Sequence, residues 1–146
     1  MPPAPRALKF RGVGAPFALR TAQQLQFSVE KLTLRAARKG PTIIELYVPD
    51  SGWLRMGIGL SKSVLSFRPA EEAAKGKNGL KHCVSLANNG GSDDIVYWTW
   101  CDHDRHGYER RNLIDMKVAN AAFELFFQTG ELSPDVKWEV FKPGAA

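Results

Sequence analysis

The sequence predicts a single α+β domain, in which an antiparallel sheet of five or six strands carries two helices, the longer one near the C-terminus. The chain has 146 residues, enough for one domain with a real core. Its middle contains several short runs rich in β-branched and aromatic residues, separated by turn residues. One helical pattern precedes these runs and another follows most of them. We expect both helices to pack on one face of the sheet.

Residues 1–20 are expected to form an irregular leader, and residues 21–146 the folded domain. The leader contains four prolines and two glycines, with room for a short strand near residues 8–11. It is also basic, since residues 1–40 hold eight Lys or Arg and one acid, whereas residues 41–146 hold twelve and fourteen. A nucleic-acid-binding fold usually carries its basic excess on the folded body. The net charge of +5 therefore argues only weakly for nucleic acid.

The first helix is expected over residues 28–39, with Ser28 as N-cap and Gly40 before Pro41 as its end. Just upstream, an alternating strand pattern competes with the helical spacing. The β-rich runs come next, and the Pro-Asp-Ser-Gly turn at residues 49–52 predicts a hairpin. The expected strands are residues 42–48, 53–60, 63–67, 82–87, 95–100 and 136–141.

The C-terminal third carries the strongest helical pattern. Residues 101–107 are expected as a polar loop, and residues 108–114 as a short edge strand. The helix follows over residues 115–128, with Asp115 as N-cap and Gly130 as its stop.

Cysteine usage and hydropathy indicate the compartment. Cys83 and Cys101 form no CxxC pair; a bridge between neighbouring strands stays open, but two reduced thiols are favoured. No apolar run approaches the roughly 20 residues that span a bilayer. The N-terminus lacks the apolar core of a secretory signal. We therefore expect a soluble, cytoplasmic protein with no membrane partner.

Catalytic residue types concentrate only at residues 101–106, CDHDRH. The two histidines there are three residues apart and lack an HExxH or CxxC context, so a metal site is the minor alternative. The zinc-deaminase pattern is absent, and strand cysteines are usually inert packing residues. Gly57 and Gly59 lead into no helix and indicate close packing or a bend. The sequence predicts no catalytic residue, metal, cofactor or enzymatic activity.

The strand at residues 95–100 and its flanks form the expected binding surface. Alternation puts Tyr97 and Thr99 on one face, and Trp98 and Trp100 on the other. Tyr97 is expected in the core, while core and interface suit the two tryptophans equally. Aromatic anchors ringed by charge are typical of protein–protein hot spots. The candidate contacts are Asp93, Asp94, Trp98, Trp100, Asp102 and Asp104.

A succession of packing and turn motifs covers residues 28–141. The motifs are GPTIIEL at residues 40–46, GIG at 57–59, SVLSF at 63–67, LI at 113–114, FFQTGEL at 126–132 and VKWE at 136–139. In their order and spacing the chain resembles immunity family one of bacterial polymorphic toxin systems.

The resemblance implies a single-domain antidote that binds and occludes the toxin domain of a neighbour-encoded partner, often a nucleic-acid deaminase in this family. Complementary charge would speed association, and buried aromatics would slow release. The alternative function is a nucleic-acid-associated accessory protein that uses the basic N-terminal segment. An inhibitor that imitates phosphate is expected to be acidic, whereas this chain is basic, so the class of toxin stays open. The sequence also leaves the oligomeric state open.

Overall fold

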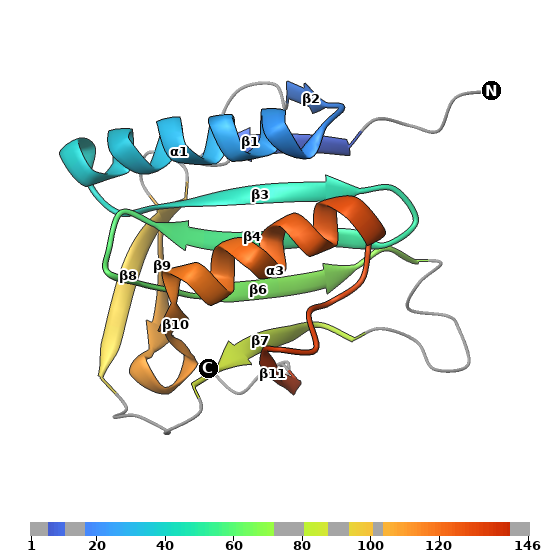
Figure 1. Cartoon of the computed structure of the whole chain (residues 1–146). Coiled ribbons are helices and arrows are strands. Elements are labelled where there is room, and N and C mark those ends of the chain that lie inside the picture. Colours follow the sequence, from blue (N-terminus) through green and yellow to red (C-terminus); the bar gives the residue numbers. More distant parts are fainter. Residues whose placement is uncertain (1–5, 11–16, 72–80, 88–93, 101–103, 141–146) are drawn as a thin grey trace.

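The computed structural model describes residues 6–10, 17–71, 81–87, 94–100 and 104–140. Within this part of the chain, two α-helices pack on one face of a mostly antiparallel sheet, as Figure 1 shows. The predicted α+β class is therefore confirmed. Neither of the two helices is long and apolar enough to cross a membrane.

The main sheet contains nine strands in the described residues, more than the five or six predicted, and two short strands form a second sheet. The strands are β1 (Arg6–Phe10), β2 (Phe17–Leu19), β3 (Thr42–Val48), β4 (Gly52–Ile58), β5 (Lys62–Ser63), β6 (Leu65–Pro69), β7 (Cys83–Leu86), β8 (Ile95–Trp100), β9 (Asp104–Glu109), β10 (Ile114–Asp115) and β11 (Lys137–Val140). The helices are α1 (Ala22–Lys39), α3 (Met116–Thr129) and a 3-10 turn, η1 (Arg110–Asn112). The order in the main sheet is β11-β7-β6-β4-β3-β1-β2, with β8 paired to β3 and β9 to β8.

The leader is not irregular where the structure describes it. β1 pairs antiparallel with β3, and β2 pairs with β1, so residues 6–10 and 17–19 extend the sheet. Leu8 and Leu19 are buried in the core. The prolines and glycines of the leader all lie outside β1 and β2. The backbone N–H groups of both strands are therefore available for pairing in the sheet.

The helix α1 begins earlier than predicted, and Ser28 is not its N-cap. Thr21 Oγ1 accepts from the Gln24 backbone N–H at 3.1 Å, and Gln24 Oε1 accepts from the Thr21 N–H at 3.3 Å. This capping box begins the helix. Leu25 and Val29, which fitted both a strand and a helix pattern, face the core from α1. With 18 residues against 14 in α3, the N-terminal helix is the longer one, so the predicted order of lengths is wrong.

The helix α3 ends at the predicted glycine, but its predicted N-cap residue makes no capping hydrogen bond. Asp115 occupies the N-cap position, but its side chain makes no cap hydrogen bond and pairs with Lys62 instead. Gly130 has a left-handed φ of 74° and terminates the helix. A Cβ at this glycine would stand 2.2 Å from Ser51 Oγ, so both the turn and the close approach require glycine.

Alternation along the central strands separates two faces of the sheet. One face packs against α1 and α3 and forms the main core. Its strand residues include Ile44, Leu46, Leu54, Met56, Leu65 and Phe67. The opposite face carries the intervening residues, and neither α1 nor α3 covers it. We call it the open face. Among its residues are Ile43, Glu45, Trp53, Arg55 and Ser66.

The β8–β9 hairpin covers one end of the open face, and β8 crosses the ends of the central strands steeply in Figure 1. Thr42 Oγ1 donates to the Thr99 carbonyl at 2.9 Å, and the Thr99 N–H donates to the Pro41 carbonyl at 3.0 Å. The polar loop predicted at residues 101–107 is wrong from position 104 onward, because β9 pairs with β8 along its length. The edge strand predicted at residues 108–114 divides into the end of β9, η1 and the start of β10.

Trp98 fills the space between the hairpin and the sheet. Its side chain is 0% exposed. Its neighbours in this second core cluster are Ile43, Val64, Val84 and Leu113. A Cβ on Gly57 would stand 2.6 Å from the indole, so the missing side chain at Gly57 lets the ring lie directly on β4. The close packing predicted at this glycine is what the structure contains.

Buried hydrogen bonds hold the exit of the hairpin against β7. Ser85 Oγ donates to the Asn112 carbonyl at 2.8 Å and accepts from the Leu65 N–H at 3.0 Å. The Asn112 side-chain amide donates in turn to the Ser85 carbonyl at 2.9 Å. Because buried polar groups are costly to leave unpaired, this network orients η1 and with it the end of β9.

Candidate functional site

The structure describes the side chains of three of the six predicted contact residues, Asp94, Trp98 and Asp104. Asp94 and Asp104 are exposed at opposite ends of the hairpin, and Asp94 Oδ2 lies 3.7 Å from Arg110 Nε. Trp98 is a core residue, so the prediction of a contact role is wrong for this side chain. Outside the described part of the chain lie Asp93, Asp102 and the side chain of Trp100.

The outward side of the hairpin carries an exposed aromatic residue that was expected to be buried. Tyr97 is 48% exposed and its neighbour Ile95 is 46% exposed. The Arg105 guanidinium lies 5.0 Å from the centre of the Tyr97 ring. The predicted alternation of this strand is correct, but the Trp98 side packs on the sheet and the Tyr97 side faces solvent. We call Ile95, Tyr97 and Arg105 the outer hairpin face.

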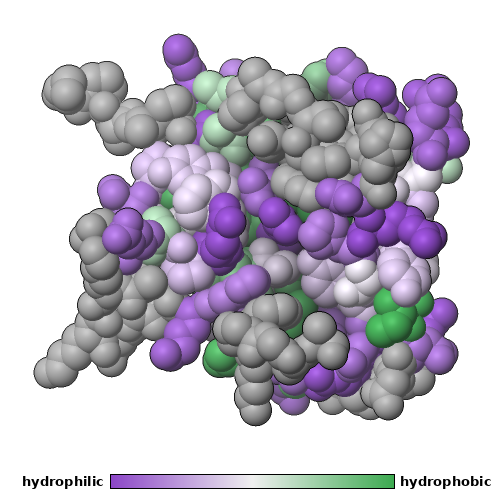
Figure 2. Space-filling view, turned by 180° about the vertical axis from the view of Figure 1, so that it is seen from behind, coloured by the Kyte–Doolittle hydropathy of each residue, from purple (hydrophilic) through white to green (hydrophobic). Residues whose placement is uncertain are grey.

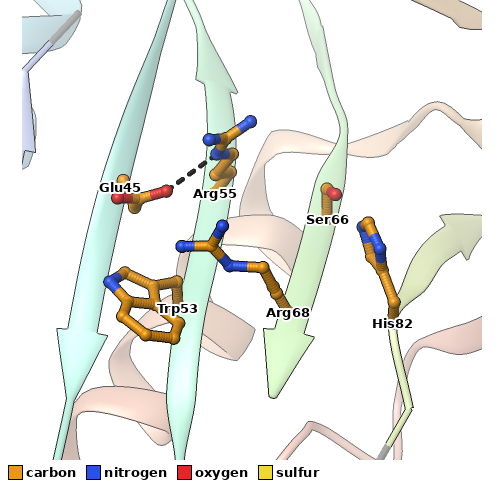
Figure 3. Close-up of a pocket in the computed structure, with 6 residues that line it drawn as sticks. All are labelled: Glu45, Trp53, Arg55, Ser66, Arg68 and His82. Carbon is orange, nitrogen blue, oxygen red and sulfur yellow. Dashed lines mark hydrogen bonds and ion pairs between the residues drawn. The ribbon is translucent and has the colours of Figure 1, made fainter. Parts of the chain in front are cut away.

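A second concentration of functional side chains lies on the open face, beside the hairpin. Six residues line a cavity of about 100 Å³ there. They are Glu45 from β3, Trp53 and Arg55 from β4, Ser66 and Arg68 from β6, and His82 just before β7 (Figure 3). We call this set the sheet-face site. Viewed from the side away from the helices, hydrophilic side chains extend across the middle of the molecule (Figure 2).

The two arginines of the sheet-face site have different surroundings. Arg55 Nε donates to Glu45 Oε2 at 2.8 Å, a partly buried ion pair across β3 and β4. The Arg68 guanidinium stacks on Trp53, with its central carbon 4.3 Å from the ring centre. The Tyr47 ring lies 5.0 Å from Trp53, centre to centre. This contact with the ring restricts the motion of the guanidinium.

The electrostatic field of the site is positive. Burial, followed by the charges of Arg68 and Arg55, lowers the pKa of His82 below its usual value, so the imidazole is neutral at pH 7. Burial and the charge of Arg55 also lower the pKa of His106, against an opposing effect of Asp104. Two imidazoles on different strands therefore sense the same guanidinium charge.

The strand β9 forms a wall of this region through Tyr108. Its ring packs edge-on against Trp98, 6.0 Å between centres. Burial raises the pKa of Tyr108, although a hydrogen bond from Ser66 and the charge of Arg55 act in the opposite direction. The hairpin and the sheet-face site are therefore parts of one packed unit, joined through Tyr108.

The described residues contain no group of three or more His, Cys, Asp or Glu arranged to hold a metal ion. Cys83 is a buried, free cysteine. Burial raises the pKa of its thiol to about 11, so the reactive thiolate is scarce at neutral pH. Of the candidate catalytic cluster at residues 101–106, the first three residues, Cys101, Asp102 and His103, lie outside the described residues.

A larger apolar groove, of about 650 Å³, lies on the helix side between α1 and α3. Leu34 lies at this groove and is 69% exposed. Gln26 Nε2 donates to Glu124 Oε1 at 2.9 Å between the two helices. The groove and the sheet-face site occupy opposite sides of the sheet, so substitutions can test them independently.

The sheet-face site was not predicted, although part of its signal is visible in the strand patterns. Glu45 and Arg55 lie inside two predicted strands, each between apolar residues that face the core. Arg68 directly follows the strand predicted at residues 63–67, and β6 extends to include it. Charged residues inside such runs mark a face that helices leave uncovered. The pairing of β4 with β6, which brings Arg68 opposite Trp53, depends on long-range register that the pattern does not contain.

No protein-family model matches the chain, and no curated protein sequence matches it. The resemblance to immunity family one therefore stays a prediction from the motifs.

Proposed function

We propose that the chain is a cytoplasmic immunity protein that binds and occludes a cognate toxin domain, and that it has no enzymatic activity of its own. The succession of motifs over residues 28–141 supports the antidote role. The observation that carries the choice of surface is the outer hairpin face, where two large side chains, Ile95 and Tyr97, are about half exposed.

The outer hairpin face has the chemistry of a protein-binding hot spot. Tyrosine and arginine are enriched in such spots, and the Arg105 guanidinium already lies over the Tyr97 ring. The hairpin is held from beneath by the buried Trp98, so little conformational entropy is lost when a partner binds. The exposed carboxylates of Asp94 and Asp104 at its ends would steer a partner of opposite charge.

The test is the affinity of the purified chain for the C-terminal toxin domain encoded immediately upstream of its gene. We expect Tyr97→Ala to weaken binding at least about tenfold, since hot-spot truncations cost about 2 kcal/mol or more. Leu34→Ala, on the helix side, serves as the control and should leave the affinity unchanged. The proposal fails if no such toxin domain exists, if the wild-type chain does not bind it, or if only Leu34→Ala weakens binding.

The alternative function, nucleic-acid association through the basic N-terminal segment, has less support. Arg6 of that segment stacks over the Phe127 ring at 5.5 Å and donates to the Gln128 carbonyl at 3.5 Å. One of its charges is therefore used in packing against α3. Retention of the full chain on double-stranded DNA at physiological salt would favour this alternative over the antidote role.

A further inference from the structure

We propose that the sheet-face site binds one carboxylate or phosphate group of an anionic ligand, with Arg68 as the principal contact and Arg55, Ser66 and His82 around it. This site lies on a different surface from the outer hairpin face. The inference therefore does not depend on the identity of the toxin or on the proposed antidote role.

The described side chains that line the cavity carry a net positive charge. They include two guanidinium groups, Arg55 and Arg68, and one carboxylate, Glu45. Arg55 Nε holds that carboxylate at 2.8 Å. Among the described lining residues the charge of Arg68 is therefore in excess, and an anion is the ligand that this balance favours.

Arg68 is held in place by an aromatic ring. Its side chain extends from β6 across the sheet to Trp53 on β4, as Figure 3 shows, with the guanidinium carbon 4.3 Å from the ring centre. The guanidinium is planar by itself, and its contact with the ring restricts its motion, which suits binding of the two oxygens of a carboxylate or phosphate. Ser66 and His82 lie on the far side of Arg68 and add polar groups to the wall.

The size of the cavity limits what it can enclose. At about 100 Å³ the cavity is smaller than the roughly 300–1,000 Å³ typical of pockets that enclose a whole small-molecule ligand. It fits one anionic group and not an entire nucleotide. The remainder of the ligand would extend over the open face.

The pKa of His82 can report whether an anion is bound in the site. Burial and the two arginines lower the pKa of His82, and a bound anion would oppose this effect and raise the pKa. Among the described residues, the charges that act on the His82 imidazole are those of Arg68 and Arg55. Glu45 lines the same cavity.

The experiment titrates the full chain with inorganic phosphate and, separately, with acetate, and follows the His82 ring signals by NMR. Chloride at matched ionic strength is the reference. We expect a saturable shift and a higher pKa of His82 with at least one anion, and the tighter anion identifies the preferred group. Arg68→Ala should weaken binding at least about tenfold, as expected for a charge-assisted contact. Arg38→Ala removes the same charge from the exposed surface of α1 and should leave binding unchanged.

Three results would overturn the proposal: no saturable response to either anion, an equal response to chloride, or equal affinity in Arg68→Ala and the wild type. Far-UV circular dichroism checks that each variant folds. Arg68→Gln keeps a polar side chain over Trp53 and replaces the alanine variant if that one is unfolded, with the same expected loss of affinity.

Discussion

Replacing Gly57 with alanine should destabilise the protein, although alanine at a permissive position usually has the opposite effect. Gly57 is not among the glycines with a left-handed φ, so the backbone accepts alanine, which alone would stabilise by about 0.4–1 kcal/mol. The new Cβ, however, would stand 2.6 Å from Cε2 and Nε1 of Trp98. Because that ring is fully buried, the overpacking costs about 1–3 kcal/mol. The cost of overpacking exceeds the entropic gain, so we expect the free energy of unfolding to fall by about 1–2 kcal/mol.

The measurement is the free energy of unfolding from urea denaturation, followed by far-UV circular dichroism. Each kcal/mol lost should also lower Tm by about 2–4 °C in a chain of this size. Gly107→Ala is the matched control, since its Cβ would stand 2.6 Å from Ile95 Cγ2 and 2.8 Å from Tyr97 Cε1. Both of these side chains are half exposed and can turn into solvent, so we expect a change within about 0.5 kcal/mol.

The double variant Gly57→Ala with Trp98→Phe identifies the cause of the loss. Phenylalanine is smaller, and Trp98 Nε1 has no hydrogen-bond partner among the described residues, so the exchange sacrifices no hydrogen bond. The second substitution should therefore cost less in the alanine background than in the wild type. If Gly57→Ala is as stable as the wild type, Trp98 does not lie on β4 and the placement of the hairpin is wrong.

Three further predictions concern the thiol, the imidazoles and the first helix. Cys83, with a pKa near 11, should react with iodoacetamide at pH 7.5 far more slowly than in the urea-unfolded chain, and equal rates would contradict its burial. Because folding lowers the pKa of His82 and His106 below 6.5, the unfolded chain binds protons first on acidification. Stability should therefore fall as the pH drops from about 7 to 5, and a stability that rises over this window would refute the assignment. Thr21→Ala should cost about 1 kcal/mol in urea denaturation by removing the cap on the Gln24 N–H, whereas an unchanged midpoint would place the start of α1 elsewhere.

The strands β3 and β8 coincide with their predicted residue ranges, because β-branched and aromatic runs bounded by turn residues are local signals. The strand β1 was expected only as a short strand near residues 8–11, and β2 was not predicted. They form because β3 offers a free edge to a segment far away in sequence, with Leu8 and Leu19 buried against the core. Such pairing is a tertiary effect that overrides local composition.

The outer hairpin face lies on the strand that the sequence singled out, but its exposed side chains are not the predicted contacts. Alternation correctly separated Tyr97 from Trp98, but the choice of the buried face depends on Gly57, which lies on a different strand. The sheet-face site was not predicted, because Arg55 on β4, Arg68 on β6 and His82 before β7 meet only through the register of the folded sheet. Local periodicity predicts which residues share a face, and tertiary packing decides what that face meets.

The central claim is that this chain neutralises a toxin domain encoded beside it. The most direct measurement is the growth of bacteria that express that toxin domain, with and without this chain. We predict that the wild-type chain and Leu34→Ala restore growth, and that Tyr97→Ala restores it less at equal expression. Growth that stays blocked in the presence of the folded wild-type chain would contradict the claim.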